Sequence, residues 1–109
     1  MILGFLIAAG CSHAPTYDDG QIEAIMRPLA YEQEIDRKCE ARQSVFDADL
    51  FVSSLSGQSA ARASEILSSV SMEVAEGEAE YVCTVELYFS TQQRANDARA
   101  MWKALKGNS

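Results

Sequence analysis

The chain has 109 residues and a formal net charge of −7, from 16 acidic and 9 basic residues. Its length predicts one domain. The acidic balance excludes nucleic-acid binding driven by bulk charge, because neutralising phosphates requires clustered Lys and Arg. One His and three Cys leave little for a zinc site or a His-based catalytic centre, so we expect no cofactor and no metal ion.

The N-terminus carries the strongest signal. Residues 1–10 are an apolar segment that ends in small residues and is followed by Cys11. A membrane-spanning helix needs about 20 apolar residues, so this segment is too short to span a bilayer and is typical of an export signal. The run Ile7-Ala8-Ala9-Gly10-Cys11 resembles the lipobox of bacterial lipoproteins.

The resemblance implies a processed and lipidated protein. In that family a signal peptidase cleaves before the Cys, whose sulfur and new amino group then carry acyl chains. Residues 1–10 would be the signal peptide, and Cys11 would be the lipidated first residue of the mature chain. Two or more acyl chains hold a protein stably on a membrane. Because Ser12 is compatible with outer-membrane sorting in this family, we expect an envelope lipoprotein on the outer membrane, facing the periplasm.

A short tether follows the anchor. Residues 11–20 are mostly polar and include Pro15 and an Asp-Gly pair, which favour loop structure. Flexible residues in this number reach about 15–18 Å root-mean-square. The sequence therefore predicts a folded domain over 21–107 that works close to its membrane.

Helical periodicity dominates the first half of that domain. An apolar face at i, i+3, i+4 and i+7 predicts a first helix, which Asp18 or Asp19 would cap and Pro28 would interrupt. A longer helix is expected over 29–54, with interspersed charges on a solvated face. The Ser-rich stretch 53–71 is either a short helix over 59–67 or an irregular loop. The two predicted apolar faces consist of Ile22, Ile25, Met26 and Leu29, and of Ile35, Cys39, Phe46 and Leu50.

The second half shows a different period. Apolar residues alternate over 70–74 and again over 81–89, which is typical of half-buried strands. Gly77 suits a two-residue type II′ turn between them. This register pairs Val74 with Tyr81, Met72 with Cys83 and Val70 with Val85, all on one face.

A last helix completes the predicted fold. Ser90 or Thr91 would cap it and Gly107 would end it. A two-stranded hairpin needs helices to cover it, so the sequence predicts an α+β fold with N-terminal helices, a β-hairpin and a C-terminal helix in two layers. The buried face of this helix would be Ala95, Ala98, Met101, Trp102 and Leu105.

Two cysteines remain once Cys11 is assigned to lipid. Cys39 and Cys83 both fall on predicted inner faces. Disulfides form and persist in the oxidising periplasm, so we expect a Cys39–Cys83 bridge, which would contribute about 4 kcal/mol in the chain-entropy model. The alternative is a pair of buried free thiols.

Acidic residues gather in the predicted hairpin. Between Arg62 and Arg94 the sequence contains no Lys or Arg, and Glu76, Glu78 and Glu80 lie around the turn. They would contribute to solubility, attract the basic last helix, or bind a basic partner or Ca²⁺. Carboxylates spread along a strand rarely converge on one ion, so we assign them to partner binding.

We therefore predict a non-enzymatic interaction protein or accessory subunit, held on the bilayer by acylated Cys11 and bound to an unidentified envelope protein. One alternative is an exclusion or inhibitor lipoprotein of the kind made by phages and plasmids. Another is a small hydrolase that uses the acidic hairpin. Aromatic side chains often anchor interfaces, and the candidates are Tyr17, Tyr31, Phe51 and Tyr88.

Overall fold

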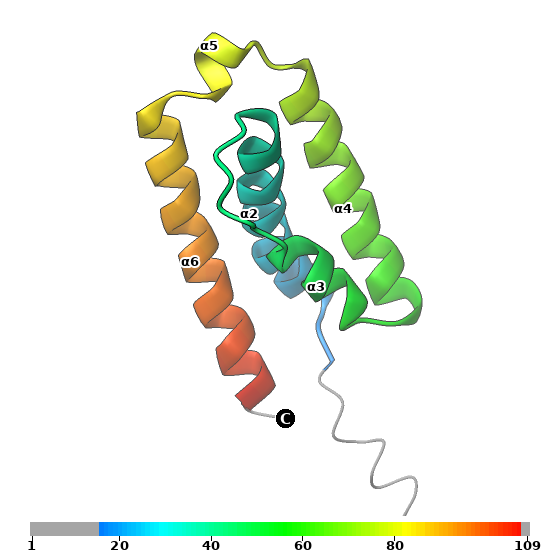
Figure 1. Cartoon of the computed structure of the whole chain (residues 1–109). Helices are drawn as coiled ribbons and strands as arrows, with labels where there is room; N and C mark the ends of the chain where they lie inside the picture. The colour runs from blue at the N-terminus through cyan, green and yellow to red at the C-terminus, as the bar shows by residue number, and fades with distance from the viewer. Residues whose placement is uncertain (1–15, 108–109) are drawn as a thin grey trace, which may run out of the picture.

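The computed structural model describes residues 16–107, and within that range the chain forms helices and no strand. The helices are α2 (Asp19–Lys38), α3 (Asp47–Ser53), α4 (Gly57–Glu76), α5 (Ala79–Val82) and α6 (Val85–Gly107) (Figure 1). The fold is a helical bundle. The prediction of an α+β fold is wrong.

Helix α2 is the centre of the bundle. Its start follows the prediction, because the Asp18 side chain accepts a hydrogen bond from the backbone N–H of Gln21 at 2.7 Å, and the Gln21 side chain accepts one from the backbone N–H of Asp18 at 3.0 Å. This reciprocal pair is a capping box. The predicted first apolar face is confirmed as core, since each of its four members is at most 1% exposed. Pro28, however, lies inside α2 and does not end it.

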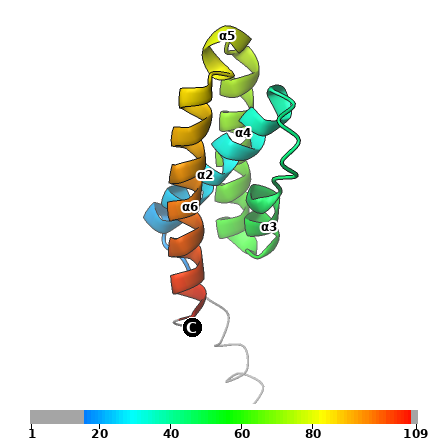
Figure 2. The same ribbon diagram turned by 60° about the vertical axis from the view of Figure 1, so that its left-hand side comes forward.

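Three helices pack around α2. Helices α4 and α6 lie on two sides of it and scarcely touch each other, and the short helix α3 covers a third side (Figure 1). Figure 2 shows α2 inclined across α6, with α3 at one edge of the bundle. Helices α3, α4 and α6 thus cover three sides of α2. Among the described residues, no helix covers the side of α2 that faces away from α3.

The predicted helix over 29–54 is wrong. Helix α2 ends at Lys38, and residues 39–46 form an irregular connection to α3. Glu40, Arg42 and Ser44 have φ angles of 52°, 59° and 52°, a left-handed conformation that a helix of L-residues does not accommodate. Of the predicted inner face, Phe46 and Leu50 are 59% and 56% exposed.

The charges of this region are also placed differently from the prediction. Glu32, Glu34 and Asp36 were expected on a solvated face, yet all three are buried. Each has a polar partner from outside α2: Arg99 contacts Glu32, Ser71 donates to Glu34 at 3.1 Å, and the Gln43 backbone N–H donates to Asp36 at 3.1 Å. Buried charges persist where such partners exist.

The predicted hairpin is a helical corner. Residues 70–76 are the last turns of α4, residues 79–82 form α5, and α6 already begins at Val85. Met72, Tyr81 and Val85, three of the side chains assigned to the buried strand face, are 63%, 68% and 66% exposed. The predicted short helix over 59–67 is part of the longer α4. The Thr84 side chain, instead of Ser90 or Thr91, accepts a hydrogen bond from the first turn of α6, from the Leu87 N–H at 3.1 Å.

Two contacts fix this corner to the end of α2. The structure contains the predicted Cys39–Cys83 disulfide, which joins the residue after α2 to the residue after α5, with 5.6 Å between the two Cα atoms. Lys38 donates to the carbonyl oxygens of Val74 at 3.0 Å, Ala75 at 2.9 Å and Gly77. The last carbonyls of a helix run out of helical donors, and the Val74 carbonyl has otherwise only the Gly77 N–H at 3.2 Å. One ammonium group therefore closes the C-terminus of α4.

Candidate functional site

A groove runs along the uncovered side of α2, between α4 and α6. Its volume is about 550 Å³, within the range of about 300–1,000 Å³ that is usual for small-molecule sites. From α2 it is lined by Ala24, Pro28, Tyr31 and Ile35, which recur at i, i+4, i+7 and i+11. This spacing places them on one face of the helix.

The opposite face of α2 is closed. Phe51 of α3 is fully buried. Its ring contacts the rings of Trp102 and Tyr17 edge-on, with 5.0 and 5.6 Å between ring centroids. Arg99 of α6 contacts both Glu32 of α2 and Asp47 of α3. The two faces of one helix thus differ: one is sealed by aromatic packing and buried charges, and the other lines a groove.

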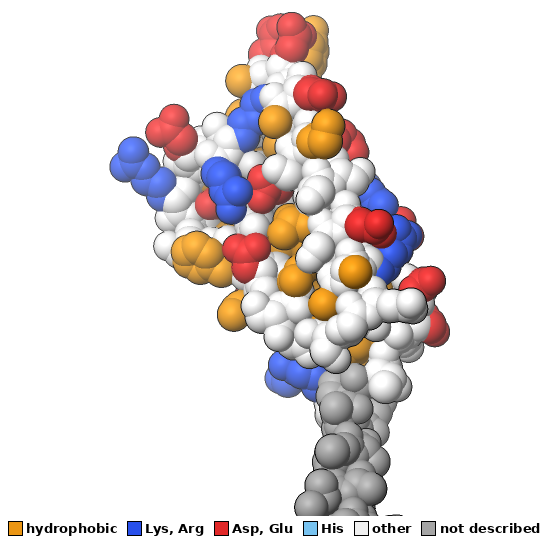
Figure 3. All heavy atoms as spheres, turned by 90° about the vertical axis from the view of Figure 1, so that its right-hand side faces the viewer, with side chains coloured by type: hydrophobic (Ala, Val, Ile, Leu, Met, Phe, Trp, Pro, Cys, Tyr) orange, Lys and Arg blue, Asp and Glu red, His pale blue; other side chains and the backbone are white. Residues whose placement is uncertain are grey.

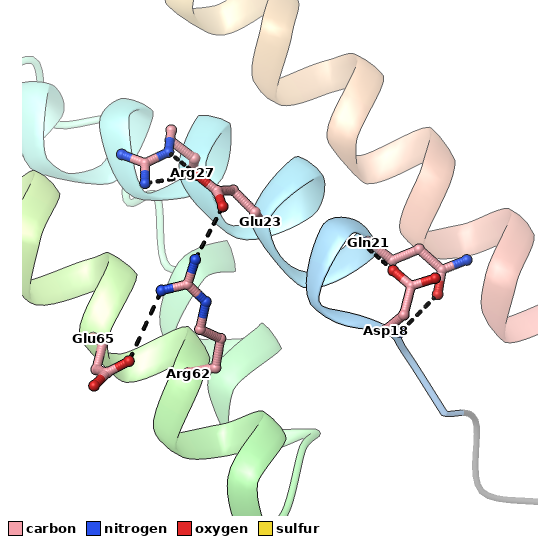
Figure 4. A network of polar contacts seen from close by, with 6 residues as sticks. All are labelled: Asp18, Gln21, Glu23, Arg27, Arg62 and Glu65. Atoms are coloured by element: carbon pink, nitrogen blue, oxygen red, sulfur yellow. Dashed lines mark hydrogen bonds and ion pairs between the residues drawn. The ribbon is translucent and has the colours of Figure 1, made fainter.

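One end of the groove is charged. Glu23 of α2 accepts hydrogen bonds from Arg27 at 2.9 and 3.1 Å and from Arg62 of α4 at 3.0 Å (Figure 4). Arg94 of α6 also lines the groove, and no hydrogen bond or ion pair of its side chain is found within residues 16–107. This end therefore has two guanidinium groups, Arg27 and Arg62, on the Glu23 carboxylate, and Arg94 lines it without contacting Glu23. Asp97 lies in an adjoining hollow.

The other end is apolar. Ile35, Val74, Val82 and Leu87 line it from four different helices. Helix α5 and its connections cross from α4 to α6 at this end (Figure 1). The disulfide and the Lys38 contacts lie at the same end, so the apolar part of the groove is also its most firmly connected part.

Two further polar features lie along the α2 wall of the groove. The Tyr31 hydroxyl is a hydrogen-bond donor at neutral pH, as any tyrosine with the ordinary pKa of about 10 is, and burial, together with the neighbouring Glu73 carboxylate, raises its pKa further. Pro28 has no N–H, so the Ala24 carbonyl four residues earlier lacks its usual helical donor. Both residues line the groove. The lining thus offers a donor and an acceptor beside its apolar surface.

The acidic residues singled out from the sequence lie elsewhere. Glu76, Glu78 and Glu80 are exposed and lie around the corner between α4 and α5. Figure 3 shows acidic side chains gathered at that end of the molecule. They are not residues that line the groove. Cys11, the expected lipidation site, lies outside the described residues.

Sequence reasoning did not identify the groove. Pro28 was interpreted as a helix interruption and Arg94 as one base of an amphipathic helix, whereas both line the same cavity. The only local signal is the breadth of the apolar surface of α2, since Ala24, Pro28 and Tyr31 continue it beyond the first predicted face.

Residues 16–107 contain no group of three or more His, Cys, Asp or Glu placed to hold a metal ion. None of the helices described is both long enough and apolar enough to cross a membrane. Comparison of the chain with protein-family models, with curated proteins and with solved structures gives no significant match. The groove and the N-terminal sequence are therefore the observations from which a function is argued.

Proposed function

We propose that this chain is a lipid-anchored, non-enzymatic binding protein of a bacterial envelope, and that it binds an apolar ligand in the groove along α2. The observation that carries the proposal is the groove itself. A largely apolar cavity with a few convergent polar groups is the usual form of a ligand site. The lipobox resemblance at residues 7–11 supports the location.

The anchor and the groove are compatible in distance. Cys11 lies a short way before Thr16 in the sequence, and an extended chain of that length spans about 18 Å at most. The charged end of the groove is formed by Glu23 and Arg27, near the start of α2. An anchored Cys11 would hold this end of the bundle close to the lipid headgroups.

The anchor is tested by the intact mass of the protein extracted from membranes of the bacterium that produces it. We expect a chain that begins at Cys11, carries acyl chains, and gains two hydrogens on reduction of the Cys39–Cys83 bridge. A Cys11→Ser variant should lose the acyl mass and leave the membrane fraction. An unmodified full-length chain in the soluble fraction would overturn the anchor.

Ligand binding is tested on the mature chain, residues 11–109 with Cys11→Ser. This chain contains the complete described core, whose buried apolar members run from Ile22 to Ala98. We expect the neutral apolar dye Nile red to bind at one site. Ala24→Trp fills the charged end of the groove and should weaken binding about tenfold, whereas Ala100→Trp, at an exposed position outside the groove, should leave it unchanged. Equal effects of the two substitutions would exclude the groove as the site.

A further inference from the structure

The length and volume of the groove suit a long, thin ligand. Its lining on α2 extends from Glu23 to Ile35, which is about 18 Å at 1.5 Å per residue. An α-helix about 10 Å wide would occupy about 1,400 Å³ over that length, whereas the groove offers about 550 Å³. A partner helix would therefore stand mostly outside it. An extended myristoyl chain has about the length of the groove and is far thinner than a helix.

The basic side chains of the groove lie away from most of its aliphatic lining. Arg94 and Arg27 lie at one end, and Val74, Val82 and Leu87 lie toward the other. Arg27 is already hydrogen-bonded to Glu23 at 2.9 Å, so among the described residues Arg94 is the lining guanidinium with no hydrogen-bond or ion-pair partner. A guanidinium pairs well with a carboxylate or a phosphate through two parallel hydrogen bonds.

We propose that the groove binds one single-chain amphiphile with an anionic head, of the fatty-acid or lysophospholipid type. This inference rests on the proposed function and names its ligand class. The head pairs with Arg94 at the end nearer the N-terminus of α2. The alkyl chain follows Ala24, Pro28 and Ile35 toward the corner formed by α5. The protonated Tyr31 hydroxyl and the Ala24 carbonyl meet the polar part of the ligand near the head.

Charge complementarity distinguishes this ligand from a neutral one. The chain as a whole carries −7, which repels anions in general, yet the groove presents Arg94, whose side chain has no polar partner within residues 16–107. The lining itself contains two acidic residues, Glu23 and Glu73, and Asp97 lies in the hollow that adjoins it. Glu23 is already paired with Arg27 and Arg62. None of these three carboxylates forms a hydrogen bond or ion pair with the Arg94 side chain in the described part of the chain.

The test measures binding of myristate and of lysophosphatidylglycerol to the mature Cys11→Ser chain by calorimetry and by displacement of Nile red. We expect one site for at least one of the two ligands. Arg94→Glu should weaken that binding about 10- to 100-fold, the range for loss of a charge-assisted hydrogen bond. Arg94→Lys keeps the charge but loses the two parallel hydrogen bonds, so it should weaken binding less than Arg94→Glu does. The tighter of the two ligands indicates whether the natural head is a carboxylate or a phosphate.

Lys103→Glu is the matched control. It makes the same charge change on the same helix, at an exposed position that does not line the groove, and it should change affinity less than twofold. Dodecyl maltoside, which has a neutral head, should be insensitive to Arg94→Glu. Circular dichroism of each variant verifies that the helices are intact.

The outcomes separate the two proposals. If Nile red binds in an Ala24-dependent way but neither anionic ligand displaces it, the ligand class is wrong and the groove remains a binding site. If Arg94→Glu and Lys103→Glu weaken binding equally, a specific head site at Arg94 is excluded. If neither the dye nor the anionic ligands bind, the proposed function of the groove falls together with its ligand.

Discussion

The two faces of α2 differ in how much of their surface other helices cover. Toward α3, the fully buried Phe51 ring and the contacts of Arg99 with Glu32 and Asp47 exclude solvent. Away from α3, Ala24 and Pro28 line an open groove. A domain of this size has a limited core, so apolar surface left uncovered is a cost to stability. The covered face supplies stability, and under the proposed function the open face is the one that binds the ligand.

Truncation of one aromatic ring on each face should give the largest contrast. Phe51→Ala removes a fully buried side chain and should lower the free energy of unfolding by about 4 kcal/mol. Tyr31→Ala removes a partly buried ring from the groove and should cost about 1 kcal/mol. Urea denaturation with the disulfide intact measures both. Similar losses would contradict the division of roles between the faces.

The disulfide should contribute nearly as much as Phe51. Cys39→Ala with Cys83→Ala removes the cross-link and should lower the free energy of unfolding by about 3 kcal/mol, somewhat below the chain-entropy value because unfolded chains retain structure. Since α4 and α6 scarcely touch, the loss should also loosen the groove. Reduction of the parent chain should reproduce both effects, and unchanged Nile red affinity in the double variant would show that α2 alone sets the width of the groove.

The sequence was sufficient for features whose causes are local or compositional. The start of α2 depends on Asp18 and the apolar spacing after it, both of which are readable within one turn. The Cys39–Cys83 bridge was predicted correctly although both elements assigned to its cysteines were wrong. That prediction rested on the count of cysteines and the expected compartment, and neither depends on secondary structure.

The prediction of a hairpin was wrong because, in a short segment, the same apolar residues fit both the two-residue period of a strand and the 3.6-residue period of a helix. Val70 and Val74 fit a strand face, but with Ile66 they also fit helical spacing, and all three are buried in α4. Met72 should be buried in a strand and is 63% exposed, which only the structure decides. Tertiary packing against α2 outweighs the β preference of valine here.

The groove and the covered face could not be predicted for a different reason. Each combines residues from helices that are far apart in sequence: Ala24, Val74 and Arg94 line the same groove, and Glu32 contacts Arg99 on α6. Glu32 was therefore expected to be solvated, because its partner lies on an element whose position relative to α2 no local pattern gives.

The contacts of Lys38 at the apolar end of the groove should contribute less to stability than the disulfide does. Lys38→Met keeps the aliphatic stem and removes the donor to the carbonyls of Val74, Ala75 and Gly77. We expect a loss of about 1–2 kcal/mol in the free energy of unfolding, because the last carbonyls of α4 lose a charged partner. Lys103→Met at an exposed position of α6 is the control and should change it by about 0.5 kcal/mol or less. If the two variants unfold alike, the contacts of Lys38 do not stabilise the corner.

The pH dependence of Glu32 is the smallest effect and the most specific to the covered face. Burial raises the pKa of Glu32 above its usual value, even though Arg99 beside it acts in the opposite direction. The folded state therefore holds this proton more tightly than the unfolded state does. The contribution of Glu32 to stability is full below the ordinary Glu pKa and is lost as pH rises through its raised folded pKa.

Glu32→Gln should remove that slope. The free energy of unfolding of the parent chain minus that of the variant, measured from about pH 4 to 7, should fall as pH rises. Glu86→Gln, at an exposed position of α6, should show no such fall. A difference that instead rises with pH would mean that the pairing with Arg99 outweighs the cost of burying Glu32. The charged cluster on the covered face would then add stability at neutral pH, and the contrast between the two faces of α2 would be larger than the packing of Phe51 alone implies.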